Sequence, residues 1–218
     1  MWIVDDFPAY GNLSGCVNKG YSHTKRVRLV HEEVLALLQF QMVGQAAILA
    51  YMIYARQRNS TYLVFYPGLT YNLNEYFKSY VVKRLREGNY RIYFIPHNMN
   101  QHWILDIIWD GEIYIINSLS HPTQFPKVEK ASIEAVKSFN SQTGRSNTMP
   151  KVKNLAGTPK QSSDYECGYV VMQYMKDIIE DKEFSFHKKW VSKSRNSYQM
   201  EELDEVRNEA LGFIEQHI

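Results

Sequence analysis

The dipeptide Asp110-Gly111 separates two apolar runs, residues 102–109 and 112–117, and it constrains the fold more than any other feature of the chain. Aspartate followed by glycine is typical of a two-residue type I′ turn, because both central residues of that turn need positive φ angles. Such a turn pairs the two runs as antiparallel strands and places Asn117 opposite Ile104. We therefore predict a β-hairpin with a defined register.

This register brings two polar side chains together. His102 lies on the same strand face as Ile104, so it is a diagonal neighbour of Asn117. Diagonal neighbours in an antiparallel pair are about 7–8 Å apart, within reach of long polar side chains. We expect the amide oxygen of Asn117 to accept a hydrogen bond from the His102 imidazole. The simpler alternative is a structural histidine at a strand end, with Asn117 as a turn residue before Ser118.

Both faces of the predicted hairpin are apolar, which is typical of central, buried strands. The face that carries His102 and Asn117 also carries Ile104, Ile108, Ile113 and Ile115. The opposite face carries Trp103, Leu105, Ile107 and Ile116. We expect a layer of structure on each side.

Helical and strand patterns occupy most of the remaining chain. Helical periodicity covers residues 32–56 with a break or bend at Gly44, 72–87 with Asn72 as the cap, 127–139, 168–180 and 200–216. Residues 61–66 and 90–95 are rich in strand formers, and residues 140–150 form a polar loop. This mixture predicts an α+β fold, with a central, mostly antiparallel sheet flanked by helices. We expect residues 1–30 to be an irregular lead-in and residues 31–218 to form one domain.

A second polar group lies in the segment from Gln161 to Gly168. Cys167 begins an apolar helical run, and the free N–H groups and dipole of a helix start favour a thiolate. The Gln161 amide and the Cys167 N–H are suited to stabilise an oxyanion, and Gly168 permits close approach of a backbone or a substrate. The alternative is a buried cysteine that merely begins a core helix. Cys16 lies in an irregular stretch with no partner motif, so we expect it to have no catalytic role.

Composition limits the classes of function. The chain of 218 residues has a net charge of +2 and two cysteines. This charge is too small to indicate nucleic-acid binding, and no apolar run approaches the length that crosses a bilayer. Two cysteines without clustered histidines argue against a disulfide framework and a structural zinc site. We expect an intracellular protein, nuclear or cytoplasmic, that binds neither nucleic acid nor membranes. The basic cluster Lys188, Lys189, Lys193 and Arg195 is expected to be an ordinary solvated face.

Taken together, these segments resemble the catalytic core of the ubiquitin-like-protein-specific cysteine proteases. This SUMO protease family shares its papain-like fold with the adenovirus protease. The matching motifs are His102-Trp103, Asn117-Ser118 at the end of the hairpin, and Gln161 followed by Cys167-Gly168 at the start of a hydrophobic helix. The strand from Tyr93 to Pro96 also fits. The resemblance spans roughly residues 30–182 and looks most like the divergent versions in plant genomes and mobile elements.

The resemblance implies a hydrolase that cleaves peptide or isopeptide bonds after the C-terminal Gly-Gly of a ubiquitin-like modifier such as SUMO or ubiquitin. It implies no metal or organic cofactor. It assigns four catalytic roles: nucleophile to Cys167, base to His102, orienting group to Asn117 and oxyanion donor to Gln161. It places three residues at the substrate: Trp103, Gly168 and Glu166.

The chain departs from the family pattern in three places. The usual aspartates are replaced by Asn117 and Glu166, and the helix near Met42 lacks the tryptophan that often lines the channel for the Gly-Gly tail. An amide can still hold an imidazole in the correct tautomer, as in Cys-His-Asn proteases. Two alternatives stay open. One is a weak or inactive relative that only binds a ubiquitin-like protein, and the other is a Cys-His acyltransferase on the same fold.

Overall fold

The computed structural model describes residues 2–4, 27–59, 61–67, 70, 73–87, 92–120, 125–145, 149–155, 157–183, 185–192 and 197–217. The helices among these residues are α1 (His31–Leu38), α2 (Gln45–Arg58), α3 (Glu75–Glu87), α4 (Pro126–Gln142), α5 (Cys167–Glu180), α6 (Phe186–Ser192) and α7 (Met200–Glu215). The strands are β1 (Trp2–Val4), β2 (Val27–Leu29), β3 (Tyr62–Val64), β4 (Ile92–Met99), β5 (His102–Trp109), β6 (Glu112–Asn117) and β7 (Val152–Asn154).

The main sheet has the order β3-β4-β5-β6-β7. Its central pairs, β4 with β5 and β5 with β6, are antiparallel. The short edge strands β3 and β7 pair in parallel with β4 and β6, so the sheet is mixed, but its long central ladders are antiparallel, as predicted. The α+β class predicted from sequence is confirmed.

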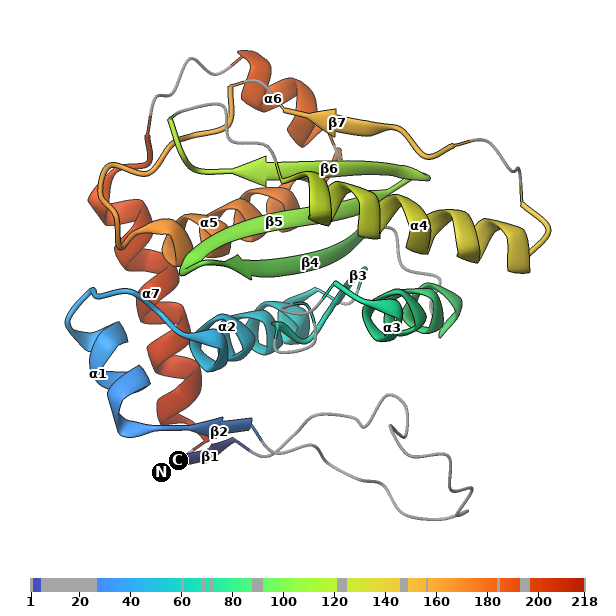
Figure 1. The fold of residues 1–218 in the computed structure, drawn as a ribbon. Coiled ribbons are helices and arrows are strands. Elements are labelled where there is room, and N and C mark those ends of the chain that lie inside the picture. The colour runs from blue at the N-terminus through green and yellow to red at the C-terminus, as the bar shows by residue number, and fades with distance from the viewer. Residues whose placement is uncertain are drawn as a thin grey trace, which may run out of the picture.

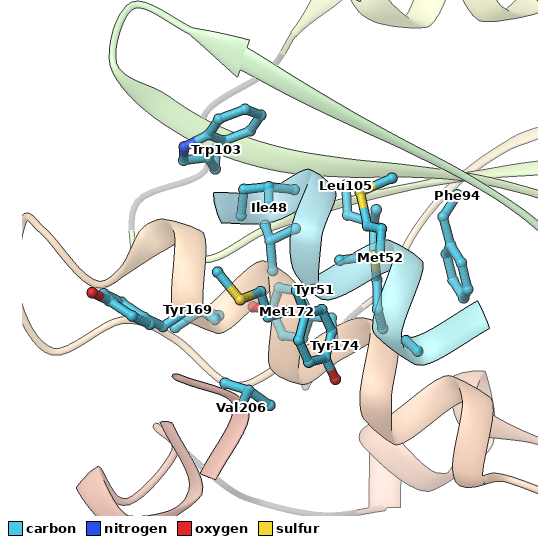
Figure 2. Packing of buried hydrophobic residues seen from close by; sticks show 14 of the residues in the cluster. Ile48, Tyr51, Met52, Phe94, Trp103, Leu105, Tyr169, Met172, Tyr174 and Val206 are labelled. Atoms are coloured by element: carbon cyan, nitrogen blue, oxygen red, sulfur yellow. The ribbon is translucent and has the colours of Figure 1, made fainter. Parts of the chain in front are cut away.

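The sheet separates two hydrophobic cores, with helices on each side (Figure 1). On one face, Trp103, Leu105 and Ile116 pack with buried side chains of α2, α5 and α7 (Figure 2). On the other face, Ile104 and Ile113 pack with α3 and α4. The predicted assignment of the hairpin residues to two buried faces is therefore confirmed.

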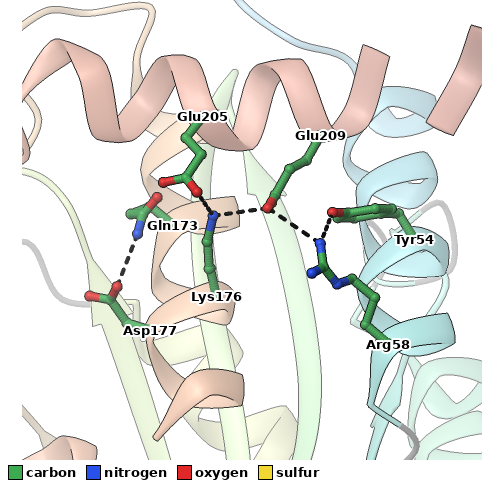
Figure 3. Close-up of polar contacts among 7 residues, drawn as sticks. All are labelled: Tyr54, Arg58, Gln173, Lys176, Asp177, Glu205 and Glu209. Atoms are coloured by element: carbon green, nitrogen blue, oxygen red, sulfur yellow. Dashed lines mark hydrogen bonds and ion pairs between the residues drawn. The ribbon is translucent and has the colours of Figure 1, made fainter. Parts of the chain in front are cut away.

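Polar contacts tie together three helices of the first core. The Lys176 ammonium of α5 lies 2.7 Å from a Glu205 carboxylate oxygen and 2.9 Å from one of Glu209, both on α7 (Figure 3). Glu209 also lies 3.9 Å from the guanidinium of Arg58, which ends α2. Lys176 is largely buried, and burying a charge is costly unless it is paired. These pairs therefore hold α5 in a fixed position against α7.

Chain-breaking residues set several boundaries. Gly44 is the N-cap of α2, so the predicted break between α1 and α2 is confirmed. Helix α3 begins at Glu75, and the Asn74 side chain caps it by accepting hydrogen bonds from the N–H groups of Tyr76 and Phe77 at 2.9 and 3.3 Å. The cap predicted at Asn72 lies outside the described residues.

Three expectations differ from the structure. Residues 2–4 and 27–29 form an antiparallel pair, so the lead-in is not wholly irregular. Strand β4 continues past Ile95 to Met99, because its last four residues pair with residues 102–105 of β5. Helix α6 and strand β7 were not predicted. The domain division at residue 30 stays a prediction.

Two glycines offer a matched test of the hairpin turn. Gly111 has φ of 76°, whereas Gly212 lies inside α7, and a Cβ atom would meet nothing within 4 Å at either position. We predict that Gly111→Ala lowers the free energy of unfolding by about 1 kcal/mol, because alanine is strained at positive φ. Gly212→Ala should raise it by about 0.5–1 kcal/mol, because alanine is the better helix former. Urea denaturation of both variants measures this; equal effects of the same sign would contradict the type I′ assignment.

Candidate active site

The β5–β6 hairpin has the predicted turn and register. Asp110 and Gly111 have φ angles of 50° and 76°, as a type I′ turn requires. Ile104 pairs with Asn117 across the strands. As a result, His102 Nε2 lies 2.8 Å from Asn117 Oδ1, so the predicted neighbourhood of these two side chains is confirmed.

A backbone group fixes the roles in this hydrogen bond. The N–H of Leu119 donates to Asn117 Oδ1 at 3.0 Å, which identifies that atom as the amide oxygen. An amide oxygen only accepts, so His102 must donate from Nε2. Nδ1 of the neutral imidazole is then the unprotonated nitrogen, which is the atom a general base requires.

His102 is half-buried and stacks against Phe125, with ring centroids 6.4 Å apart and an angle of 17° between the planes. Phe125 immediately precedes α4, so that helix places an aromatic wall beside the imidazole. Burial lowers the pKa of His102, and the hydrogen bond with Asn117 offsets this only partly. The imidazole is therefore biased toward its neutral, basic form.

Cys167 is the first residue of α5 and is buried. Its Sγ lies 3.9 Å from the carbonyl oxygen of Gln101, and the backbone N–H of Trp103 also interacts with the thiol. The sulfur thus contacts the backbone on both sides of His102. The structure brings the predicted nucleophile to the segment that carries the predicted base.

The close approach of α5 to this segment depends on Gly168. A Cβ atom at Gly168 would lie 2.2 Å from Cγ2 of Val43 and 3.3 Å from Cδ1 of Trp103. The Val43 carbonyl in turn accepts a hydrogen bond of 3.0 Å from Trp103 Nε1. The neighbours that require a glycine here are therefore side chains of the protein itself.

As expected, N–H groups at the helix start lower the pKa of the Cys167 thiol. Burial raises the pKa of the Cys167 thiol, and this effect outweighs the N–H groups of Trp103, Gly168 and Cys167 itself, which lower it. Desolvation of a charged form dominates where few compensating charges are present. Together with the lowered pKa of His102, this favours a neutral thiol–imidazole pair.

Gln161 lies beside Ser118, the residue that follows Asn117. Its backbone N–H donates to the Ser118 carbonyl at 2.9 Å, and its side-chain oxygen accepts a hydrogen bond of 2.5 Å from Ser118 Oγ. Its Nε2 donates to the Ser163 carbonyl at 2.8 Å. An amide nitrogen carries two hydrogens, so one remains for another acceptor.

Comparisons with known proteins agree with this geometry. The profile of the Ulp1 protease family, C-terminal catalytic domain, matches residues 88–210, which is more than half of the chain. The chain belongs to the Ulp1 protease family. No curated protein sequence matches it.

Solved structures support the same fold for this Ulp1-family chain. It is 18% identical to the Ulp1 protease domain solved in complex with Smt3, the yeast ortholog of SUMO, with a TM-score of 0.61 over 85% of this chain and 82% of that one. It is 15% identical to a de-sumoylating protease, with a TM-score of 0.63 over 99% and 93%. It is 11% identical to ChlaDub1 from Chlamydia trachomatis, with a TM-score of 0.55 over 80% and 92%.

The three residues predicted at the substrate of this Ulp1-family site are all buried. Trp103 has no exposed surface. Glu166 is 4% exposed, and its carboxylate accepts hydrogen bonds from the N–H groups of Ser162 and Ser163 at 2.6 and 3.1 Å. Both side chains therefore shape the loop and wall around Cys167. Direct contact of Trp103, Gly168 or Glu166 with a substrate stays a prediction.

Sequence reasoning missed three residues of the site: Phe125, Ser118 in any role beyond the motif, and Lys160. The Lys160 ammonium donates to the backbone carbonyl of Asn117 at 2.8 Å. Hydrophobic periodicity carries no signal for such a contact, because it joins an irregular segment to a strand end.

Two features are absent from the part of the chain that the structure describes. No cluster of three or more histidine, cysteine, aspartate or glutamate side chains there is arranged to hold a metal. No helix of the described residues combines the length and the apolar character needed to cross a membrane.

The neutral resting pair predicts a specific pH profile. In a Cys16→Ala protein, alkylation of Cys167 by iodoacetamide should keep rising from about pH 6 to about pH 9, because only the thiolate reacts and the pKa of this thiol is raised. The same protein in denaturant provides the control, and its profile should lie at lower pH. A folded-state rate that is already flat near about pH 6 would indicate a thiolate–imidazolium pair instead.

Proposed function

We propose that this chain is a cysteine peptidase that hydrolyses peptide or isopeptide bonds after the C-terminal glycines of a ubiquitin-like modifier. The observation that carries the proposal is the hydrogen bond of 2.8 Å between His102 Nε2 and Asn117 Oδ1, on the segment that Cys167 contacts. It leaves Nδ1 of His102 as the base. Membership of the Ulp1 protease family supports this assignment.

The reaction starts from the neutral pair. The Cys167 thiol gives its proton to His102 Nδ1, and the sulfur bonds to the carbonyl carbon of the terminal glycine. One N–H of the Gln161 side chain and the backbone N–H of Cys167 stabilise the oxyanion. The C–N bond then breaks, and the leaving amine takes the proton from His102. Water, deprotonated by His102, hydrolyses the thioester, which restores the thiol and releases the modifier as a carboxylate.

Exposed apolar side chains near α5 support a protein substrate. Met42 is 42% exposed and directly precedes Val43, which packs on Gly168. Tyr165 is 39% exposed, lies just before Cys167, and packs edge-on against Phe40 at 5.9 Å. Large exposed apolar groups beside a nucleophile suit an extended peptide tail. The structure of a relative with Smt3, the yeast ortholog of SUMO, makes a modifier of that class the first candidate.

Covalent capture tests this function directly. A panel of ubiquitin-like proteins that carry C-terminal electrophiles is incubated with the wild-type protein, Cys167→Ala and Cys16→Ala, and adducts are detected by intact mass. We predict that wild type and Cys16→Ala form an adduct with at least one modifier and that Cys167→Ala forms none. Labelling that persists in Cys167→Ala would overturn the assignment of the nucleophile. Absence of any adduct with wild type would overturn the proposed function.

Asn117 is expected to limit catalysis rather than prevent it. A carboxylate beside an imidazole raises its pKa by about 1–3 units and so stabilises the imidazolium that forms during the reaction. We predict that Asn117→Asp raises kcat on a ubiquitin-like fusion substrate by about threefold to tenfold. Asn117→Ala should lower it by about tenfold or more, because the imidazole loses its orienting partner.

Steady-state kinetics of the three proteins measure this prediction, with unfolding curves as the control, because Asn117 also accepts the Leu119 N–H. Unchanged kcat in both variants would show that Asn117 does not orient His102. If wild type binds modifiers without turnover and only Asn117→Asp cleaves them, the natural chain is a binding protein.

A further inference from the structure

Two short segments meet at a joint beside the site. One is the end of β6, Asn117-Ser118, and the other is the pair Lys160-Gln161. Three hydrogen bonds cross between them: Gln161 N–H to the Ser118 carbonyl at 2.9 Å, Ser118 Oγ to Gln161 Oε1 at 2.5 Å, and Lys160 Nζ to the Asn117 carbonyl at 2.8 Å. The joint therefore connects the residue that orients His102 to the expected oxyanion donor.

The Ser163 carbonyl and the Ser118 hydroxyl together hold the Gln161 amide in one orientation. The Ser163 carbonyl can only accept, so the atom 2.8 Å from it must be the Gln161 nitrogen. The amide oxygen then points to Ser118, whose hydroxyl donates to it. Ser118 has no exposed surface, so water cannot replace this donor from its side. Without the hydroxyl, the Ser163 carbonyl alone would hold the amide in this orientation.

Lys160 holds the backbone of Asn117. Its side chain is half-buried, and its ammonium donates to the Asn117 carbonyl and, at 3.4 Å, to Thr158 Oγ1. Among the described residues, no carboxylate forms an ion pair with it. Burial lowers the pKa of this lysine, which is the cost of withdrawing a cation from water. Because this burial is unfavourable for the charged lysine, we infer that its role is the hydrogen bond that it donates to the Asn117 carbonyl.

The segment that carries Lys160 and Gln161 is itself anchored from the core. The Lys160 backbone forms a parallel bridge with Ser197, and the Tyr174 hydroxyl donates to the Pro159 carbonyl. Tyr174 lies on α5, the helix that begins with Cys167. Through these contacts, a shift of α5 would also shift the end of β6.

We propose that Ser118 and Lys160 are positioning residues that join the His102–Asn117 half of the site to the Gln161 half. Ser118 acts through Gln161 by holding its N–H₂ toward the developing oxyanion. Lys160 acts through Asn117 by fixing the backbone from which the orienting amide projects. This inference rests on the proposed peptidase function.

The part of the proposal that concerns Ser118, called here the Ser118 half, is tested by double-mutant cycles on a ubiquitin-like fusion substrate. Ser118→Ala should lower kcat about tenfold with little change in KM, because the lost interaction is made only in the transition state. In a Gln161→Ala background, Ser118→Ala should cause no further loss. Independent losses that add in the double variant would overturn this half, because the hydroxyl would then act elsewhere.

The Lys160 half is tested with matched variants. Lys160→Met keeps the length of the stem but removes the donor, and it should lower kcat about tenfold. Lys160→Arg should recover most of the loss, whereas Lys151→Met, a change at an exposed lysine, should leave kcat unchanged. The effect of Lys160→Met should vanish in an Asn117→Ala background. Full activity of Lys160→Met, or a loss that persists in that background, would overturn this half.

A readout without the modifier separates this inference from the proposed function. If wild type cleaves and captures no modifier, the proposed function fails, and the Ser118 half fails with it. Iodoacetamide alkylation of Cys167 in Cys16→Ala proteins then decides the Lys160 half. Lys160→Met should change the alkylation rate at neutral pH in the same direction and to the same extent as Asn117→Ala, because both loosen His102. An unchanged rate in Lys160→Met would overturn it.

Discussion

The pairing of β5 with β6 determines how His102 and Asn117 lie relative to each other. Because Ile104 pairs with Asn117, His102 Nε2 reaches Asn117 Oδ1 at 2.8 Å. A slip of one residue would move Asn117 to the opposite face of the sheet, into the core that α5 packs against. Apolar side chains fill both faces of the hairpin, so such a slip would also bury polar groups on each side. The same burial that stabilises the sheet therefore fixes the catalytic register.

Burial also sets the chemical state of the resting site. It raises the pKa of the Cys167 thiol and lowers that of His102, so burial favours the neutral form of each group. Asn117 orients the imidazole but adds no charge to stabilise an imidazolium. A site of this kind depends on donors placed in advance for the oxyanion, which gives the fixed Gln161 amide particular weight.

Local sequence was sufficient for the parts of the fold that local chemistry decides. Asp110-Gly111 specified a turn and hence a register, and the strong apolar periodicity of residues 168–180 marked α5. Helix α6 and strand β7 are short, and their formation depends on tertiary contacts, such as the packing of Phe186 against Trp109 and Tyr114. The end of β4 depends on its pairing with β5, whereas the cap at Asn74 is a local contact with the N–H groups of Tyr76 and Phe77.

The residues of the site also divide into those that local sequence indicates and those that only the folded chain brings together. His102, Asn117, Cys167 and Gln161 were found because their motifs are short and their strand or helix context is clear. Phe125 and Lys160 escaped notice because they come from irregular segments that only the folded chain brings to the site. The opposing effect of burial on the thiol was not predicted, because a helix start is visible in sequence, whereas desolvation is a property of the packed structure.

The measurement that tests the central claim most directly is cleavage of ubiquitin-like fusion proteins in water enriched in heavy oxygen, followed by intact mass analysis. Hydrolysis through a Cys167 thioester predicts a modifier that ends at its terminal glycine and carries one heavy oxygen atom in its new carboxylate. Cys167→Ala should yield no product. Cleavage at another position, a product in which an amine rather than water has accepted the modifier, or undiminished cleavage by Cys167→Ala would contradict the account.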